Sequence, residues 1–300
     1  MKILLLGQNG QVGWELQRAL APLGELHACG RQEADLEDID SVCEMVERLR
    51  PQVIVNASAY TMVDKAESEP DKAQAINAHA VGRLGVQADR IGAWLVHYST
   101  DYVFDGSKPA PYSESDPTGP LSTYGRTKLE GEQQLRAALA RHLIFRTSWV
   151  FAARGNNFAK TMLRLACERD ALSVVADQHG APTSAELIAD VTALALYRAL
   201  HAIDGSQLAG TYHLAASGAT SWHGYAQFVL SLARDKGINL KVQPEQVRPI
   251  ATEDYPTPAA RPRNSRLDTS RLEQTFQLHL PDWRHHVRRM IEELALQENP

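Results

Sequence analysis

The sequence of 300 residues predicts an α/β protein with a doubly wound parallel sheet and a smaller C-terminal lobe. Two observations carry this prediction. Short apolar runs alternate with segments of helical spacing through the first half of the chain, and a glycine-rich turn follows the first apolar run. Strands that alternate with helices form βαβ units, in which the strands are parallel and the helices cover both faces of the sheet.

The expected elements follow one another in regular order in the first half of the chain. The first strand is expected at 2–6, and the segment after it carries apolar residues at helical spacing, at Val12, Leu16, Ala19 and Leu20. Later strands are expected at 25–29, 53–55, 93–98 and 143–147. Helices between them are expected at 39–49, 71–91 and 123–140. Residues 1–150 are therefore predicted to form the sheet domain.

After Trp149 the alternation loosens. Helical spacing recurs at 157–168, 184–200, 222–236 and 282–296. A proline-rich stretch occupies 255–262. We expect residues 151–300 to form mainly a smaller, substrate-binding lobe, and we leave open that segments of it return to the first domain.

Composition narrows the class of partner. The formal net charge of −5 argues against nucleic acid, which usually requires a basic face. The first apolar run ends at Gly7, too soon for a secretory signal, and no later run approaches the roughly 18 apolar residues of a membrane helix. Cys29, Cys43 and Cys167 form neither a CxxC pair nor a zinc pattern. We expect a cytoplasmic protein with no nucleic-acid or membrane partner.

A glycine-rich turn, Gly7, Gly10 and Gly13, lies between the first expected strand and its helix. Glycine lets a backbone approach a pyrophosphate closely, and a helix that begins near Gly10 points free N–H groups at phosphate. The GxxGxxG spacing alone is a weak signal, but its place after an N-terminal strand favours a Rossmann-type dinucleotide site. The alternative is a turn that only packs helix against strand.

The end of the second expected strand, Ala28-Cys29-Gly30-Arg31, bears on the choice of cofactor. An acid there would hydrogen-bond the ribose 2′-hydroxyl of NADH, whereas an arginine accepts the 2′-phosphate of NADPH. Gly30 provides no carboxylate, and Arg31 follows it directly. The sequence therefore favours NADPH, although a solvated surface role for Arg31 remains the alternative.

Tyr124 and Lys128 are four residues apart at the start of the helix expected at 123–140, and Ser122 is a suitable N-cap. A nearby ammonium lowers the pKa of a phenol and enables it to exchange a proton with a reacting oxygen. Such a pair on a helix is usually solvated surface. Here the preceding strand ends in Tyr98-Ser99-Thr100-Asp101, at the edge of the sheet where ligands bind, so we predict a catalytic pair.

Together these residues resemble the extended short-chain dehydrogenase/reductases and, more closely, the dTDP-4-dehydrorhamnose reductase family. The resemblance covers the whole chain. GxxGxxG and YxxxK specify only the superfamily, whereas the segments at 99–104 and 146–150 narrow it to this reductase group. Further matching segments lie at 55–67, 155–158 and 261–267.

The resemblance implies roles for individual residues. Tyr124 would be the proton donor, and Lys128 would also hold the nicotinamide ribose. Thr100 would be catalytic beside this pair and, with Asp101, would meet the sugar, with Trp149 against it. The implied contacts of the cofactor are Gly7, Gly10, Gln11, Val12, Gly13, Arg31, Asp35, Leu36, Ala59, Tyr60, Thr61, Tyr98, Tyr124 and Lys128. Members of the group often have an acid where this chain has Gly30, which puts use of NADH in doubt.

The resemblance also implies magnesium at a homodimer contact. The matching acids are Glu15 and Glu186, with Asp190 one turn after Glu186. Hard cations prefer carboxylates, but helical acids are more often a solvated face. The scattered histidines, including His285 and His286, are assigned no role.

Three functions are compared. The first is reduction, by NADPH, of the C4 keto group of dTDP-4-dehydro-L-rhamnose. The second is a nucleotide-sugar epimerase or dehydratase with bound NAD, although a dehydratase usually adds an acid pair and only Asp101 follows Thr100. The third is a non-catalytic regulatory subunit, which an intact Tyr124 and Lys128 argue against.

Overall fold

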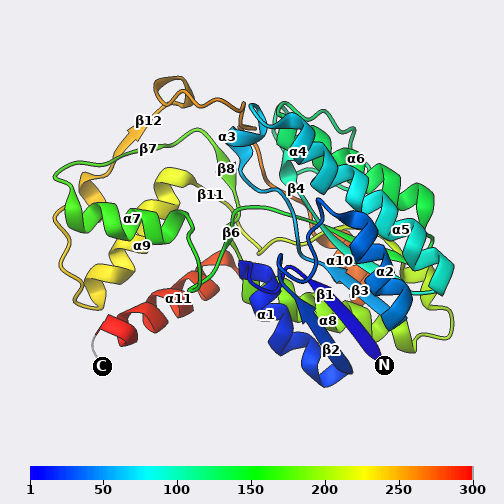
Figure 1. The fold of residues 1–300 in the computed structure, drawn as a ribbon. Coiled ribbons are helices and arrows are strands. Elements are labelled where there is room, and N and C mark those ends of the chain that lie inside the picture. The colour runs from blue at the N-terminus through cyan, green and yellow to red at the C-terminus, as the bar shows by residue number, and fades with distance from the viewer. Residues whose placement is uncertain (299–300) are drawn as a thin grey trace.

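The computed structural model describes residues 1–298, and a six-stranded parallel sheet forms its centre (Figure 1). The strands lie in the order β2-β1-β3-β4-β5-β10. Their bounds are β1 Lys2–Leu6, β2 Glu25–Cys29, β3 Val53–Asn56, β4 Trp94–Thr100, β5 His142–Thr147 and β10 Gly210–His213. The predicted doubly wound fold is confirmed, and each predicted strand is present within two residues of its expected ends.

Helices cover both faces of the sheet because successive strand residues point to opposite sides. Ile3, Leu5 and Val55 face one core, which α1 (Gln11–Leu20), α8 (Ala185–His201) and α10 (Ser270–Phe276) complete. Leu4 and Ile54 face the other core. That face is covered by α2 (Ile39–Leu49), α5 (Ala80–Ile91) and α6 (Thr123–Ala138). Strand residues are thus buried on both sides, as a parallel sheet requires.

The segment expected to form one helix at 71–91 is in fact three joined pieces. α4 (Pro70–Gln74) leads into a π-helical turn (Ala75–His79), and α5 continues from there. The turn packs against α6, where a Cβ on Gly131 would lie 2.1 Å from the carbonyl oxygen of Asn77. Asn77 is buried and holds the backbone of Tyr60 through both of its amide atoms.

The C-terminal half divides between the sheet and a separate lobe. α8 packs against α1, and β10 adds to the sheet beside β5, so residues 185–213 lie with the first domain. The lobe is built from α7 (Phe158–Glu168), α9 (Trp222–Asp235) and the parallel pair β7 (Ser173–Val175) and β12 (Arg248–Ile250), which stand apart from the sheet in Figure 1. Its core includes Met162, Leu230 and Val242.

Short elements connect the two parts. β6 (Val150–Phe151) pairs with β9 (Thr183–Ser184), and β8 (His179–Gly180) pairs with β11 (Thr220–Ser221). α3 (Val63–Ala66) follows β3, and α11 (Trp283–Glu298) is the last helix. Within residues 1–298, none of the helices has the length and apolar character needed to cross a membrane.

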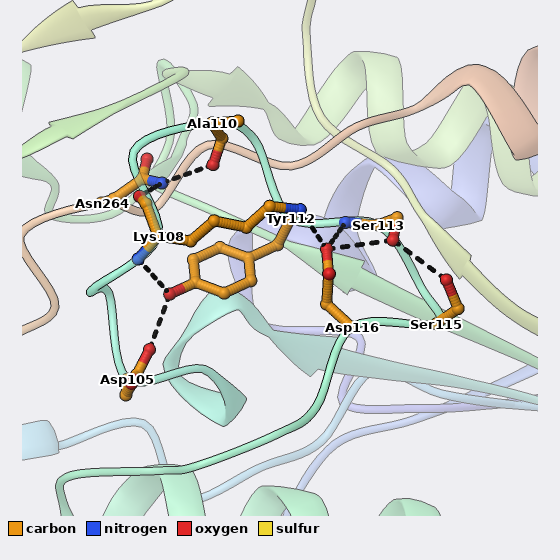
Figure 2. Close-up of polar contacts among 8 residues, drawn as sticks. All are labelled: Asp105, Lys108, Ala110, Tyr112, Ser113, Ser115, Asp116 and Asn264. Carbon is orange, nitrogen blue, oxygen red and sulfur yellow. Dashed lines mark hydrogen bonds and ion pairs between the residues drawn. The ribbon is translucent and has the colours of Figure 1, made fainter.

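The loop between β4 and α6 is fixed by a polar cluster around Tyr112 (Figure 2). Its phenol donates to Asp105 at 2.6 Å and accepts from the backbone N–H of Lys108 at 3.1 Å. Lys108 pairs with Asp116, and the Asn264 amide donates to the carbonyls of Lys108 and Ala110. The cluster sets the path of the chain that leads to α6.

We predict that Tyr112→Phe lowers the free energy of unfolding by about 1 to 3 kcal/mol, because Asp105 and the Lys108 N–H lose a buried partner. Urea unfolding followed by circular dichroism measures the change. Tyr255→Phe is the control, since Tyr255 is an exposed side chain. An equally small effect in both variants would show that the Tyr112 phenol does not hold this loop.

Candidate active site

A cavity of about 840 Å³ opens along the carboxyl ends of the central strands. It extends from the glycine turn after β1, past the end of β4 and the start of α6, to Trp222 and Arg261 from the C-terminal half. The carboxyl edge of a doubly wound sheet is where such folds bind ligands. The cavity therefore brings the glycine turn and the Tyr124–Lys128 pair into one site.

The glycine turn has the geometry of a phosphate cradle. Gly7 has a φ of 88°, and a Cβ there would lie 2.7 Å from the Ser58 hydroxyl. Gly10 is the N-cap of α1, and no side chain caps that helix, so its first N–H groups face the cavity without a side-chain partner. Free N–H groups at a helix N-terminus bind phosphate. The residues present thus fit a dinucleotide pyrophosphate.

Arg31 lies at the far end of this cavity but is already paired. Its guanidinium contacts the carboxylates of Asp35, at 3.0 Å, and Glu37, and the latter also binds Lys72. These carboxylates raise the pKa of Arg31. The Glu33 carboxylate accepts from the Gly30 N–H at 2.8 Å. Gly30 itself provides no carboxylate, as the sequence shows, but the Glu33 side chain places one at this strand end.

Tyr124 and Lys128 lie on the inner face of α6. The helix begins as predicted, with the Ser122 hydroxyl accepting from the Gly125 N–H at 3.1 Å. Burial raises the pKa of Tyr124, the Thr100 hydroxyl opposes this rise, and the Asp101 carboxylate adds to it. The Nζ of Lys128 donates to the Tyr98 carbonyl oxygen at 2.6 Å rather than to the phenol. The pKa of the phenol is thus raised in the cofactor-free protein, whereas the pair was expected to lower it.

Thr100 and Asp101 close the end of β4. The Thr100 hydroxyl donates to the Asp101 carboxylate at 3.0 Å and accepts from the Tyr102 N–H. Burial raises the pKa of Asp101 to about 6. Its second carboxylate oxygen has no hydrogen-bond partner among the described residues. A buried unpartnered oxygen beside Tyr124 marks a place where a polar ligand group would bind.

Aromatic residues and an arginine form the opposite wall. The rings of Trp149 and Trp222 stack with centroids 3.6 Å apart. Trp149 has a φ of 49°, a strained conformation for a non-glycine residue that is common at functional sites. Arg261 pairs with Asp64 at 2.7 Å and contacts the Tyr102 hydroxyl. An arginine in such a wall suits an anionic ligand such as a diphosphate.

Of the predicted catalytic, cofactor-binding and substrate-binding residues, the structure brings all but two into this cavity. Gly13 lies beneath the turn, where a Cβ would be 2.0 Å from the Gly7 carbonyl oxygen, so it serves close packing. Tyr60 directs its hydroxyl to Glu69, 2.7 Å away, and does not line the cavity. The predicted residues that do line it are Gly7, Gly10, Gln11, Val12, Arg31, Asp35, Leu36, Ala59, Thr61, Tyr98, Thr100, Asp101, Tyr124, Lys128 and Trp149.

Other residues that line the cavity were not predicted from the sequence. Trp222 follows an ordinary helix N-cap, Ser221, and nothing in the sequence singles it out. Arg261 lies in the segment 261–267, which resembles the reductase family, but no role was predicted for it from the sequence. Ile76 lines the cavity because the π-helical turn places it there.

The predicted metal ligands lie outside this cavity. Glu15 and Glu186 line a small hollow between α1, α8 and α11, and burial together with Glu186 raises the pKa of Glu15. Asp190 instead pairs with Arg18 at 2.8 Å. Within the described part of the chain, no group of three or more His, Cys, Asp or Glu side chains is arranged to hold a metal. Glu15 and Glu186 therefore come together without a third such ligand arranged with them among the residues the structure describes.

The fold and site define the class of protein: an extended short-chain dehydrogenase/reductase, with a Rossmann-type sheet, a glycine turn and a tyrosine–lysine pair. Comparison with known proteins narrows this further. Residues 1–296 match the family model described as RmlD substrate binding domain, and the chain belongs to this family.

Named relatives agree with this assignment. A dTDP-4-dehydrorhamnose reductase from Shigella flexneri is 54% identical over 302 aligned residues, covering 98% of each chain. Among solved structures, the same enzyme from Clostridium acetobutylicum has a TM-score of 0.88 at 38% identity, covering 98% of this chain and 99% of that one. One from Bacillus anthracis in complex with NADP has a TM-score of 0.87 at 36% identity, covering 97% and 99%.

Proposed function

We propose that this protein reduces the C4 keto group of dTDP-4-dehydro-L-rhamnose to give dTDP-L-rhamnose, with NADPH as the reductant. The observation that carries the proposal is one cavity that holds the glycine turn, Thr100 and the Tyr124–Lys128 pair. Relatives that are more than 50% identical over nearly the whole chain are named for this reductase activity. The protein is thus an NAD(P)H-dependent oxidoreductase.

Each residue of the pair has a distinct part in the reaction. When bound on the glycine turn and Lys128, NADPH would supply the hydride for C4 of the sugar. Tyr124 donates its phenolic proton to the keto oxygen, which leaves a hydroxyl on the sugar and a phenolate on the enzyme. Thr100 hydrogen-bonds that oxygen and aligns it with the phenol. Lys128 stabilises the phenolate electrostatically and holds the ribose, and burial in the cavity strengthens both effects.

The substrate's other groups have partners on the aromatic wall. Asp101 has an unpartnered carboxylate oxygen for a sugar hydroxyl. Trp149 presents an indole against the hexose, and Arg261 offers a guanidinium to the diphosphate.

The assay that tests the proposal follows NADPH oxidation with a panel of nucleotide-linked 4-keto sugars. Rapid turnover of the dTDP-linked 6-deoxy sugar supports it, and oxidation with no member of the panel would reject it.

We propose NADPH as the preferred cofactor, with Arg31 as the group that binds the 2′-phosphate. Because the carboxylates of Asp35 and Glu37 pair with Arg31, the phosphate must compete with them for its guanidinium. We expect wild type to favour NADPH over NADH by about tenfold in kcat/KM, and Arg31→Ala to lose that preference. Steady-state kinetics with both cofactors measures this.

The matched control for Arg31 is Arg83→Ala, since Arg83 also pairs with an exposed acid, Asp40, but lies outside the cavity. Its cofactor preference should equal that of wild type. If Arg31→Ala kept the same preference, Arg31 would be a solvated surface charge.

Magnesium and a homodimer remain proposals. What supports them is the concentration of acids Glu15, Glu186 and Glu293 in one hollow, where the two other carboxylates raise the pKa of Glu15 and a cation would relieve their repulsion. We expect Mg²⁺ to increase the dimer fraction, and EDTA to reverse it, in sedimentation velocity runs. Glu15→Gln should abolish the difference. Equal monomer content with Mg²⁺ and with EDTA would argue against both proposals.

A cytoplasmic location and the absence of a nucleic-acid partner stay predictions from the sequence.

A further inference from the structure

A buried histidine lies beneath the catalytic helix, and the mechanism above does not use it. His97 is in the middle of β4, opposite Asn56 on β3 and Ile144 on β5, and its side chain is fully buried. Its Nε2 is 3.3 Å from the Nζ of Lys128, and its Nδ1 is 3.3 Å from the Nδ2 of Asn56. His97 thus links the sheet interior to the catalytic lysine.

Hydrogen bonding determines the tautomer of this imidazole. The Oδ1 of Asn56 accepts from the Ser58 N–H at 3.1 Å, so the amide nitrogen of Asn56 faces His97 as a donor. The Nδ1 of His97 must then accept. Burial and the nearby Lys128 lower the pKa of His97, which keeps the ring neutral. A neutral ring that accepts at Nδ1 has its proton on Nε2 and points that proton at Lys128.

This N–H bears on the charge of Lys128. An ammonium has three donors and no lone pair, whereas a neutral amine can accept from Nε2–H while it donates to the Tyr98 carbonyl oxygen. Burial lowers the pKa of Lys128 to about 8, and Glu132 opposes that shift. The Glu132 carboxylate is itself held by Arg146 and Arg136, which limits its effect on Lys128.

Apart from the two arginines that hold Glu132, the groups around Lys128 are not cationic. Tyr124 lies one turn earlier on α6, and Asp101 lies beside that phenol. The Tyr98 carbonyl oxygen is on β4. The Nε2–H of His97 is therefore the group here that specifically favours the amine over the ammonium.

We propose that His97 is a positioning residue: with its tautomer selected by Asn56, it holds the Nζ of Lys128 against β4 and disfavours the ammonium form in the cofactor-free protein. The proposal rests on the proposed reductase function for its kinetic consequence. Because the ammonium is the form that stabilises the Tyr124 phenolate, His97 then sets the pH at which kcat/KM declines on the alkaline side. A core histidine with a packing role alone would set neither property.

The main test is an NMR titration of the lysine side chains, labelled with ¹³C at Cε, in the cofactor-free protein. Lys128→Met identifies the Lys128 signal. In His97→Gln the side-chain carbonyl can accept from an ammonium, so we expect the pKa of Lys128 to rise by about half a unit or more. The alkaline limb of kcat/KM should move to higher pH by the same amount.

His142→Gln is the matched control. His142 is another buried strand histidine, the first residue of β5, but it bonds the Leu139 carbonyl oxygen and lies outside the cavity. It should leave both the Lys128 titration and the pH profile unchanged. An unchanged Lys128 pKa in His97→Gln would overturn the proposal.

A second measurement needs no variant. The ¹⁵N shifts of the His97 ring in wild type distinguish the two neutral tautomers, and we expect the proton on Nε2. A proton on Nδ1 would overturn the proposal even if His97→Gln failed to fold. Neither NMR experiment needs substrate, so wild type that oxidised no NADPH would reject the proposed function while these titrations still decide the role of His97.

Discussion

Tyr124→Phe should lose about 100- to 10,000-fold in kcat while keeping its fold and its affinity for NADPH. The change removes the proton donor and leaves the aromatic ring, which packs edge-on against Tyr102 with centroids 5.6 Å apart. Packing and the cofactor cradle are therefore undisturbed. Steady-state NADPH oxidation gives kcat, and calorimetry gives the dissociation constant of NADPH.

The matched control is Tyr197→Phe, which removes an exposed phenol on α8 far from the cavity. It should turn over like wild type. A Tyr124→Phe enzyme within a few-fold of wild type in kcat would show that another group supplies the proton.

Lys128→Met should lose both turnover and cofactor affinity, with kcat lower by about 100-fold or more. The methionine is similar in length and fills the buried space, but it cannot stabilise the phenolate or bind ribose hydroxyls. The free energy of unfolding should equal that of wild type, because a buried amine with a pKa of about 8 is replaced by an apolar group. Kinetics, calorimetry and chemical denaturation measure the three quantities.

Lys160→Met separates this effect from the loss of a lysine bond to a backbone carbonyl oxygen. Lys160 also donates to a backbone carbonyl, that of Ala153 at 2.8 Å, but it does not line the cavity. Its kcat and NADPH affinity should match wild type. Unchanged NADPH affinity in Lys128→Met would remove the ribose role, and unchanged kcat would remove the electrostatic one.

Local signals made much of the fold and part of the site predictable. The alternation of apolar runs with segments of helical spacing correctly predicts the strands β1 to β5. Ser122 gives a cap signal that the structure confirms at the start of α6. Gly7 is predictable because its backbone must approach other atoms closely, which a Cβ would prevent. Such features depend on neighbours within a few residues.

Other features depend on contacts between distant parts of the chain. Trp222 and Arg261 reach the cavity only because the lobe folds back over the sheet, which no local pattern reports. Glu33 places a carboxylate at the Gly30 N–H through its side-chain conformation, which the local sequence does not report. His97 sits in a strand among apolar residues, and its link to Asn56 follows from the register between β3 and β4.

The proposed reductase activity is tested most directly by identifying the product by NMR and measuring NADPH consumption in the same reaction. If the protein is a reductase, one NADPH is oxidised for each dTDP-4-dehydro-L-rhamnose consumed, and dTDP-L-rhamnose accumulates. An altered or dehydrated nucleotide sugar formed with no net NADPH consumption would contradict the account, because it would indicate an epimerase or dehydratase on the same fold.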